Sequence, residues 1–161
     1  MVGLRVHFET ETAHRLFNVD TYSAECRENL HGHTYKYDVE VTTKDGKLNS
    51  ANMICDFKLL KETIKEFEKK YDHSVIIKED DPLAPVLVKE CRKVNVVKSN
   101  PTAEWMVSTF VDELNTLFDS KNLGIKVISL NIATCYLLKR KFSNIDYMYT
   151  KEVLSIFSSI Y

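Results

Sequence analysis

A histidine–glycine–histidine triplet, His31-Gly32-His33, opens a run of β-branched and aromatic residues that continues to Val41. This composition predicts a β-strand. In a strand, side chains two residues apart leave the same face, roughly 7 Å apart at their roots, whereas in a helix they diverge. The triplet therefore predicts two imidazole rings side by side on one face of a sheet.

A second predicted strand carries a third histidine. Residues 4–12 alternate apolar and polar side chains, and His14 follows directly after them. If the two strands pair antiparallel, His14 joins His31 and His33 in a group of three imidazoles. Three neutral nitrogen ligands with one open position are typical of catalytic zinc, because structural zinc is closed by four protein ligands. Because the motif is short, the alternative that these histidines are ordinary polar strand residues stays open. His7 is expected to be a surface or sheet residue.

The rest of the chain predicts two helices followed by a further pair of strands. Asp56 is a typical N-cap for a helix that runs to Tyr71, and a second helix begins at Pro101. Residues 124–133 alternate again and predict a strand. Shorter predictions are a strand near Met53, an irregular connection over 72–100 with a solvated turn at 79–81, a last strand beginning at 135–138, and a terminal helix at 152–159.

The order of these elements predicts an α+β fold. Strands at 4–12 and 33–43, two helices and a final pair of strands would form an antiparallel β-sheet with two helices on one face. The chain has 161 residues and shows no repeat or linker, so we expect a single domain over 1–161.

Charge and composition exclude some classes of function. The formal net charge is −1, so no general nucleic-acid-binding surface is expected. No apolar run is long enough for a membrane span, and the N-terminus has no signal-peptide pattern. The four cysteines lack a C-x-x-C spacing, which favours free thiols in a reducing compartment. We therefore expect a cytoplasmic protein that binds neither nucleic acid nor membrane.

Four motifs resemble the 6-pyruvoyltetrahydropterin synthase family. They are residues 27–33 with the preceding His14, the apolar-Asp-Phe segment within 53–61, Asp72-His73 after Tyr71, and Pro-Thr-Ala-Glu at 101–104, in the family's order. The resemblance implies the tunnelling fold (T-fold), in which such sheets join into a barrel-like homo-oligomer, a trimer or a hexamer. It also implies zinc (Zn2+) on His14, His31 and His33, and a pterin triphosphate as the small-molecule substrate.

Glu28 distinguishes between members of this family. Members that make pyruvoyltetrahydropterin carry a catalytic cysteine at the spacing C-x5-H-G-H. The queuosine-pathway relatives carry it at C-x3-H-G-H. Cys26 of this chain lies at C-x4-H-G-H and fits neither spacing. Glu28 fits E-x2-H-G-H and resembles the glutamate variant that serves folate biosynthesis. That resemblance implies a lyase that cleaves the side chain of 7,8-dihydroneopterin triphosphate to give 6-hydroxymethyl-7,8-dihydropterin.

A glutamate is a reasonable catalytic base in place of a thiol. Its reference pKa of about 4.3 keeps it ionised, whereas a thiol with a pKa of about 8.5 needs a nearby cation. Burial beside a substrate raises the pKa of a carboxylate towards a value suited to a general base. Two alternatives stay open: Glu28 as a solvated loop acid, and Cys26 as the nucleophile or base.

The remaining motifs have roles implied by the resemblance. Asp72 and His73 resemble the family's proton relay, with His73 the proton carrier and Asp72 its orienting group. Because the two are adjacent, they need a turn geometry to interact, and the alternative is a simple cap of the preceding helix. Glu104 matches a carboxylate that accepts hydrogen bonds from the 2-amino and N3-H edge of the pterin, with Thr102 beside it. The alternative is that Glu104 only stabilises the helix N-terminus.

One position departs from the family pattern. The family has a second pterin-binding glutamate on a late strand, and this chain has Ala133 there. A buried donor edge left unpaired costs about 1–3 kcal/mol, so Ala133 predicts weaker or lost pterin binding. Arg15, Arg27 and Lys78 are the cations nearest to the motifs and are candidates for binding the triphosphate.

Three hypotheses follow. The leading one is a zinc-dependent lyase acting on dihydroneopterin triphosphate, with Glu28 as the base. The second is the 6-pyruvoyl- or 6-carboxytetrahydropterin synthase activity of the same family. The third belongs to another class, a non-catalytic zinc- or pterin-binding relative, and Ala133 is the feature that supports it.

Overall fold

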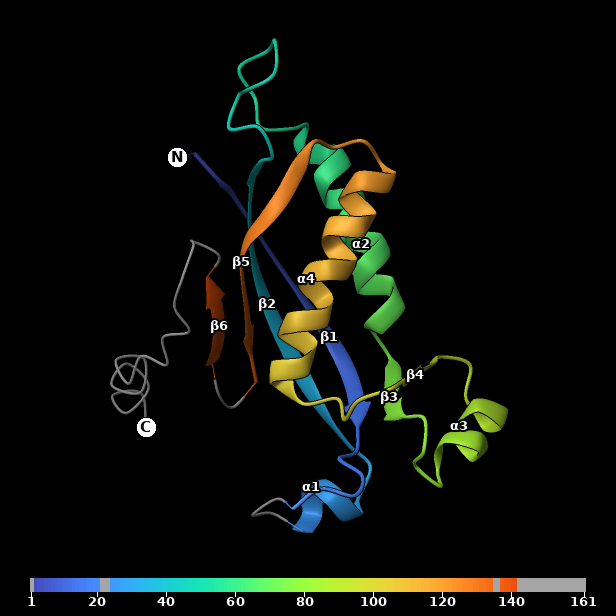
Figure 1. Ribbon diagram of the computed structural model, residues 1–161. Helices are drawn as coiled ribbons and strands as arrows, with labels where there is room; N and C mark the ends of the chain where they lie inside the picture. The colour runs from blue at the N-terminus through green and yellow to red at the C-terminus, as the bar shows by residue number, and fades with distance from the viewer. Residues whose placement is uncertain (1, 21–23, 135–136, 142–161) are drawn as a thin grey trace.

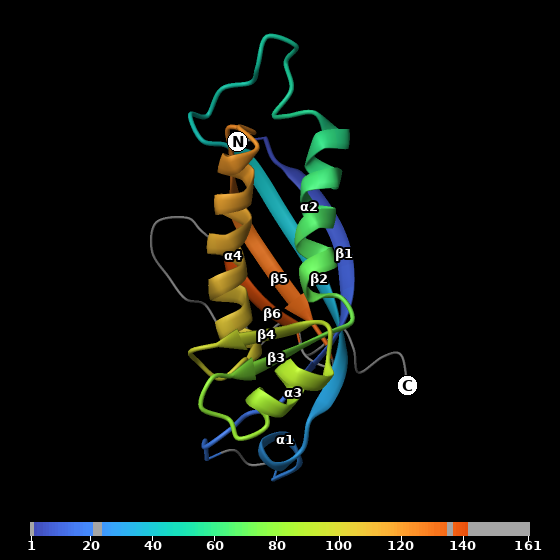
Figure 2. The ribbon, with the colours of Figure 1, turned by 90° about the vertical axis from the view of Figure 1, so that its right-hand side faces the viewer.

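The computed structural model describes residues 2–20, 24–134 and 137–141. The strands are β1 (Leu4–His14), β2 (His31–Thr43), β3 (Ser74–Lys78), β4 (Val94–Val97), β5 (Ile125–Ala133) and β6 (Leu137–Lys141). The helices are α1 (Ala24–Glu28), α2 (Phe57–Tyr71), α3 (Ala84–Glu90) and α4 (Ala103–Ser120). The strands form one sheet in the order β4-β3-β1-β2-β5-β6, and α2 and α4 lie side by side on one of its faces (Figure 1 and Figure 2).

Long antiparallel strands form the centre of the sheet. β1 pairs with β2 from Leu4 opposite Val41 to His14 opposite His31, and β2 and β6 both pair antiparallel with β5. The predicted α+β fold with two helices on one face of the sheet is therefore confirmed, but the sheet is mixed rather than antiparallel throughout. β3 and β4 extend this sheet as parallel strands beyond the end of β1.

The two long helices begin where a local side chain satisfies their first N–H groups. The Asp56 carboxylate accepts hydrogen bonds from the N–H groups of Lys58 and Leu59. The Thr102 hydroxyl accepts one from the N–H of Trp105. Both contacts are typical N-caps, which explains why the sequence predicts these helix starts well.

Aromatic side chains fill the space between the helices and the sheet. Phe110 of α4 is fully buried, and its ring centroid lies 4.3 Å from that of Tyr71, 5.1 Å from that of Phe67 and 6.0 Å from that of Tyr37. The core therefore joins both helices to β2 through one cluster of rings.

The predicted irregular connection over 72–100 is wrong, because this segment contains β3, α3 and β4. β3 pairs with only the last three residues of β1, and β4 pairs with β3. Strands of four and five residues are too short to show a period in the sequence, and they form here because the edge of β1 is available. The solvated turn predicted at 79–81 is also wrong for Asp81, which is buried.

Two shorter predictions have different outcomes. No strand forms near Met53, because the Asn49 side-chain oxygen accepts hydrogen bonds from the N–H groups of Ala51 and Met53 and closes a turn. The predicted last strand is present as β6, while residues 135–136 and the predicted helix at 152–159 lie outside the described residues. Among the helices of the described residues, none combines the length and apolar character needed to cross a membrane.

Candidate metal centre

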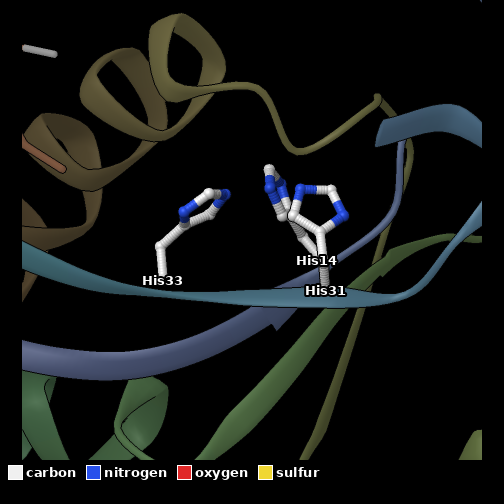
Figure 3. A group of neighbouring side chains, drawn as sticks. All are labelled: His14, His31 and His33. Atoms are coloured by element: carbon white, nitrogen blue, oxygen red, sulfur yellow. The ribbon is translucent and has the colours of Figure 1, made fainter. Parts of the chain in front are cut away.

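Three histidines from two paired strands lie together at one end of the sheet. His14 ends β1, opposite His31 of β2, and Thr12 lies opposite His33, so all three rings leave the same face of the sheet. Their ring centroids are 4.6 Å (His14–His31), 5.3 Å (His14–His33) and 5.0 Å (His31–His33) apart. One nitrogen from each ring lies within 4.8 Å of the others, and the rings point to the side of the sheet where the chain enters α4 (Figure 3).

Backbone carbonyl groups orient two of the three rings. His14 Nδ1 donates a hydrogen bond to the carbonyl oxygen of Pro101 at 2.7 Å, and His31 Nδ1 donates one to that of Asn29 at 3.1 Å. Because each Nδ1 carries the proton, each Nε2 keeps its lone pair. A carbonyl on the outer nitrogen is the common way in which proteins fix the tautomer of a metal-binding histidine.

Burial favours the neutral form of two of the three rings. The pKa of His14 is lowered to about 4, mainly by burial and also by the neighbouring His31 and His33, while the hydrogen bond to Pro101 acts in the opposite direction. Burial also lowers the pKa of His33, with His31 adding to the effect. Neutral imidazoles are the form that binds metals, so the lowered pKa values of His14 and His33 favour metal binding at neutral pH.

The set of donors fits zinc. The described residues contribute three imidazoles and no cysteine or carboxylate to this group. Three imidazole ligands suit zinc and leave one of its four positions open to a substrate or water.

Tyr35 is a neighbour of the group that the sequence analysis missed. It follows His31 and His33 on the same face of β2, it is buried, and its hydroxyl lies 3.4 Å from His14 Nε2. Tyr35 lies two residues after His33, so the alternation of the strand could have predicted that its side chain shares the face of the two histidines.

Glu28 is near the histidines in sequence, but its side chain is exposed. It is the last residue of α1, three residues before His31, and its carboxylate lies 3.7 Å from Arg27 Nε. The N–H of Leu16 donates to the carbonyl of Cys26, which ties α1 to the loop that follows His14. The structure therefore brings α1 to the correct end of the sheet and shows no contact between Glu28 and the rings.

Asp72 and His73 form a pair in the turn between α2 and β3. His73 has a positive φ of 53°, and this turn lets its Nδ1 lie 2.8 Å from Asp72 Oδ2. Asp72 Oδ1 also accepts the N–H of Glu11, which holds the pKa of Asp72 below its usual value. Asp72 is the C-cap residue of α2, but its side chain binds β1 and His73 rather than the helix end. The His73 side chain is 76% exposed and is not part of the group formed by His14, His31 and His33.

The start of α4 lies beside the histidines through the contact between Pro101 and His14. The Thr102 hydroxyl is the N-cap of α4, and Glu104 is exposed in the first turn. Ala133 ends β5 opposite Lys36, which places its side chain on the sheet face opposite His31 and His33. The prediction that Arg15 binds the triphosphate is not supported, because its guanidinium group binds the buried carboxylate of Asp81.

Comparisons with known proteins identify relatives of this chain. The family model described as 6-pyruvoyl tetrahydropterin synthase matches residues 3–133. A 6-carboxy-5,6,7,8-tetrahydropterin synthase from Rickettsia conorii is 28% identical over 134 residues, covering 81% of this chain and 93% of that protein.

Solved structures share the fold. An uncharacterised protein from Wolinella succinogenes has a TM-score of 0.67 at 20% identity, covering 88% of this chain and 98% of the other. A Plasmodium vivax 6-pyruvoyltetrahydropterin synthase, solved with cysteine in place of a catalytic glutamate, has a TM-score of 0.59 at 16% identity, covering 88% and 98%. These findings confirm the predicted family and the α+β fold.

Proposed function

The chain belongs to the 6-pyruvoyl tetrahydropterin synthase family, and we propose that it is a zinc-dependent lyase that converts 7,8-dihydroneopterin triphosphate to 6-hydroxymethyl-7,8-dihydropterin. The observation that carries this proposal is Glu28, three residues before His31 at the E-x2-H-G-H spacing. Cys26 does not stand at either of the family's cysteine spacings. The Plasmodium vivax relative, whose catalytic residue is also a glutamate, supports this assignment.

In the proposed reaction, the substrate lies between the three histidines and Glu28. His14, His31 and His33 would hold the zinc, which would supply Lewis acidity towards the hydroxyl groups of the substrate side chain. Glu28 acts as the general base that moves a proton at the side chain next to the pterin ring. Glu104, exposed at the start of α4, accepts hydrogen bonds from the 2-amino and N3-H edge of the pterin, with Thr102 beside it.

His73 is proposed as the proton carrier and Asp72 as its orienting group. The 2.8 Å contact between His73 Nδ1 and Asp72 Oδ2 leaves His73 Nε2 directed elsewhere, and the ring is exposed. Because this pair does not touch the histidine group in one chain, we propose that catalysis takes place at a boundary between subunits of a homo-oligomer, a trimer or a hexamer.

Metal binding is tested separately from turnover. We expect His33→Ala to lower the zinc affinity by more than about 100-fold. Even the loss of a group that only hydrogen-bonds to a metal ligand lowers metal affinity 10- to 100-fold. Competition with a chromophoric chelator measures the affinity. His7→Ala, which removes a histidine from the opposite face of β1, is the control and should leave zinc binding unchanged.

Product analysis tests the reaction. We would incubate zinc-loaded protein with 7,8-dihydroneopterin triphosphate and identify the pterin product by mass spectrometry. We expect 6-hydroxymethyl-7,8-dihydropterin, with turnover at least about 100-fold lower in Glu28→Ala, as is typical for loss of a general base. Glu25→Ala, an exposed glutamate of the same short helix, is the matched control and should keep its activity.

Two other results would replace this proposal. The Rickettsia conorii relative is a 6-carboxytetrahydropterin synthase, so that activity is the second candidate, and Glu28→Cys tests whether a thiol favours a pyruvoyl or carboxy product. No turnover from zinc-loaded protein would favour a non-catalytic zinc- or pterin-binding protein. In that case Ala133→Glu tests whether restoring the missing carboxylate restores pterin binding.

A further inference from the structure

β4 ends the sheet in the part of the chain that the structure describes. The carbonyl groups of Lys93 and Val97 accept hydrogen bonds from the N–H groups of Val75 and Glu79, so these positions of the strand face β3. Because successive residues of a strand direct their backbone groups to opposite sides, those of Val94 and Val96 point away from β3. β4 therefore presents an unpaired backbone edge, which is a template for another strand.

A groove of about 530 Å³ runs beside this edge. Trp105 and Glu113 of α4 and Tyr71 of α2 line the groove together with β4. Val96 is 46% exposed, and its side chain leaves the opposite face of the sheet from those of Asn95 and Val97. An open strand edge and an adjacent groove with an aromatic wall are the two features used in strand-addition binding of peptides.

Positive charge flanks the strand at both ends. Arg92 and Lys93 precede it, Lys98 follows it, and none of the three makes an ion pair with a carboxylate among the described residues. The Lys93 ammonium group donates instead to the backbone carbonyls of Lys69 and Asp72. Glu113, the acid in the groove, is already paired with Lys70 and accepts the Tyr71 hydroxyl. The charges of Arg92 and Lys98 are therefore available to a ligand, whereas Lys93 already acts on the carboxylate of Asp72.

We propose that β4 is a docking edge for an extended, acidic segment of a partner protein. The segment adds as a strand beside β4, its side chains on the helix side lie over the groove, and its acidic residues meet Arg92 and Lys98. Charge argues against a second copy of this chain, because antiparallel self-pairing of β4 with Val94 opposite Val96 places Arg92 opposite Lys98. Like charges directly opposite each other destabilise a strand pair.

A synthetic peptide tests this proposal on the full, zinc-loaded chain. The probe is the capped peptide Glu-Asp-Val-Thr-Val-Asp-Glu, and the control peptide carries lysine at every acidic position. Trp105 is the single tryptophan of the chain and lies in the groove, so its fluorescence reports binding directly. We expect the acidic peptide to bind with a Kd below about 1 mM and the basic peptide not to bind. Neither turnover nor metal affinity enters this readout, so its result is independent of the proposed function.

Matched variants separate strand addition from simple charge attraction. Val96→Pro removes one outward N–H and keeps the pairing with β3, so it should weaken binding about tenfold, whereas Val96→Ala should not. Lys98→Glu should weaken binding about fivefold, and Lys126→Glu, an exposed site on β5, should have no effect. The proposal is overturned if the acidic peptide does not bind at 1 mM, if both peptides bind equally, or if Val96→Pro binds like the parent. Dimerisation that Val96→Pro abolishes would overturn it in favour of a second copy.

Discussion

Asp80 and Asp81 are adjacent acids with very different surroundings. Asp80 pairs with Lys78 at the surface, whereas Asp81 is buried, binds the Arg15 guanidinium group and accepts the N–H of Leu83. Nothing in the local sequence separates them, because the partner of Asp81 is 66 positions away. At the scale of the residue, burial and distant partners decide which charged group stabilises the fold.

This contrast predicts unequal effects of the same substitution. Asp81→Ala should lower the free energy of unfolding by about 3–5 kcal/mol, because it leaves the Arg15 charge largely buried and unpaired. Asp80→Ala removes a surface pair and should change it by less than about 0.5 kcal/mol. Urea denaturation of both variants measures the difference, and equal effects would contradict the role given to Asp81.

Asp72 makes stability depend on acid pH. Its pKa is lowered in the folded protein, first by the hydrogen bond from the Glu11 N–H and then by His73. A lowered folded pKa contributes stability above the unfolded value of 3.8, and this contribution is lost as the pH falls below it. Asp72→Asn should therefore lose less stability than the parent when the urea midpoint is compared at pH 6 and pH 3. Glu62→Gln, on the exposed face of α2, is the control. An equal loss of stability between pH 6 and pH 3 in Asp72→Asn and in the parent would exclude this role of Asp72.

At the scale of the element, α2 and α4 act as one unit through Phe110. Phe110→Ala should lower the free energy of unfolding by about 3–5 kcal/mol, because the ring packs against residues of α2 and β2 and leaves a cavity when removed. Val86→Ala, at an exposed position of α3, should cost less than about 0.5 kcal/mol. Chemical denaturation of both variants checks this, and a loss of under 1 kcal/mol for Phe110→Ala would show that the helices pack independently.

Elements with local determinants were predictable from the sequence, and those with distant partners were not. Asp56 and Thr102 cap their own helices, and β1, β2 and β5 are long enough to show alternation. β3 and β4 form because the end of β1 offers an edge, and for β3 this partner lies more than 60 residues earlier in the chain. Their short apolar runs therefore gave no local signal of a strand. In the site, alternation predicted the three histidine rings, whereas the carbonyl groups that orient them come from loops whose positions only the fold determines.

At the scale of the whole molecule, β1 provides an unpaired backbone edge in addition to the edge of β4. The N–H and C=O groups of Glu11 face β3, where they bind Asp72 and His73, so those of Glu9 and His7 face the same way. β3 pairs only with residues 12–14 of β1. In the described residues, no strand therefore covers this edge over residues 7–11. The homo-oligomer proposed above would cover it with a strand of a second copy.

Glu9→Pro tests whether this edge assembles the protein. Proline removes one outward N–H from β1 and leaves the hydrogen bonds to β2 in place, so the chain should fold but fail to associate. Light scattering after size-exclusion chromatography should give three or six times the mass of one chain for the parent and for Glu9→Ala, and one chain mass for Glu9→Pro. Because His73 and the group of His14, His31 and His33 do not meet within one chain, the monomer should bind zinc with unchanged affinity and lose turnover. A monomer with full turnover would show that one chain holds a complete site and would remove the reason for placing His73 at a subunit boundary.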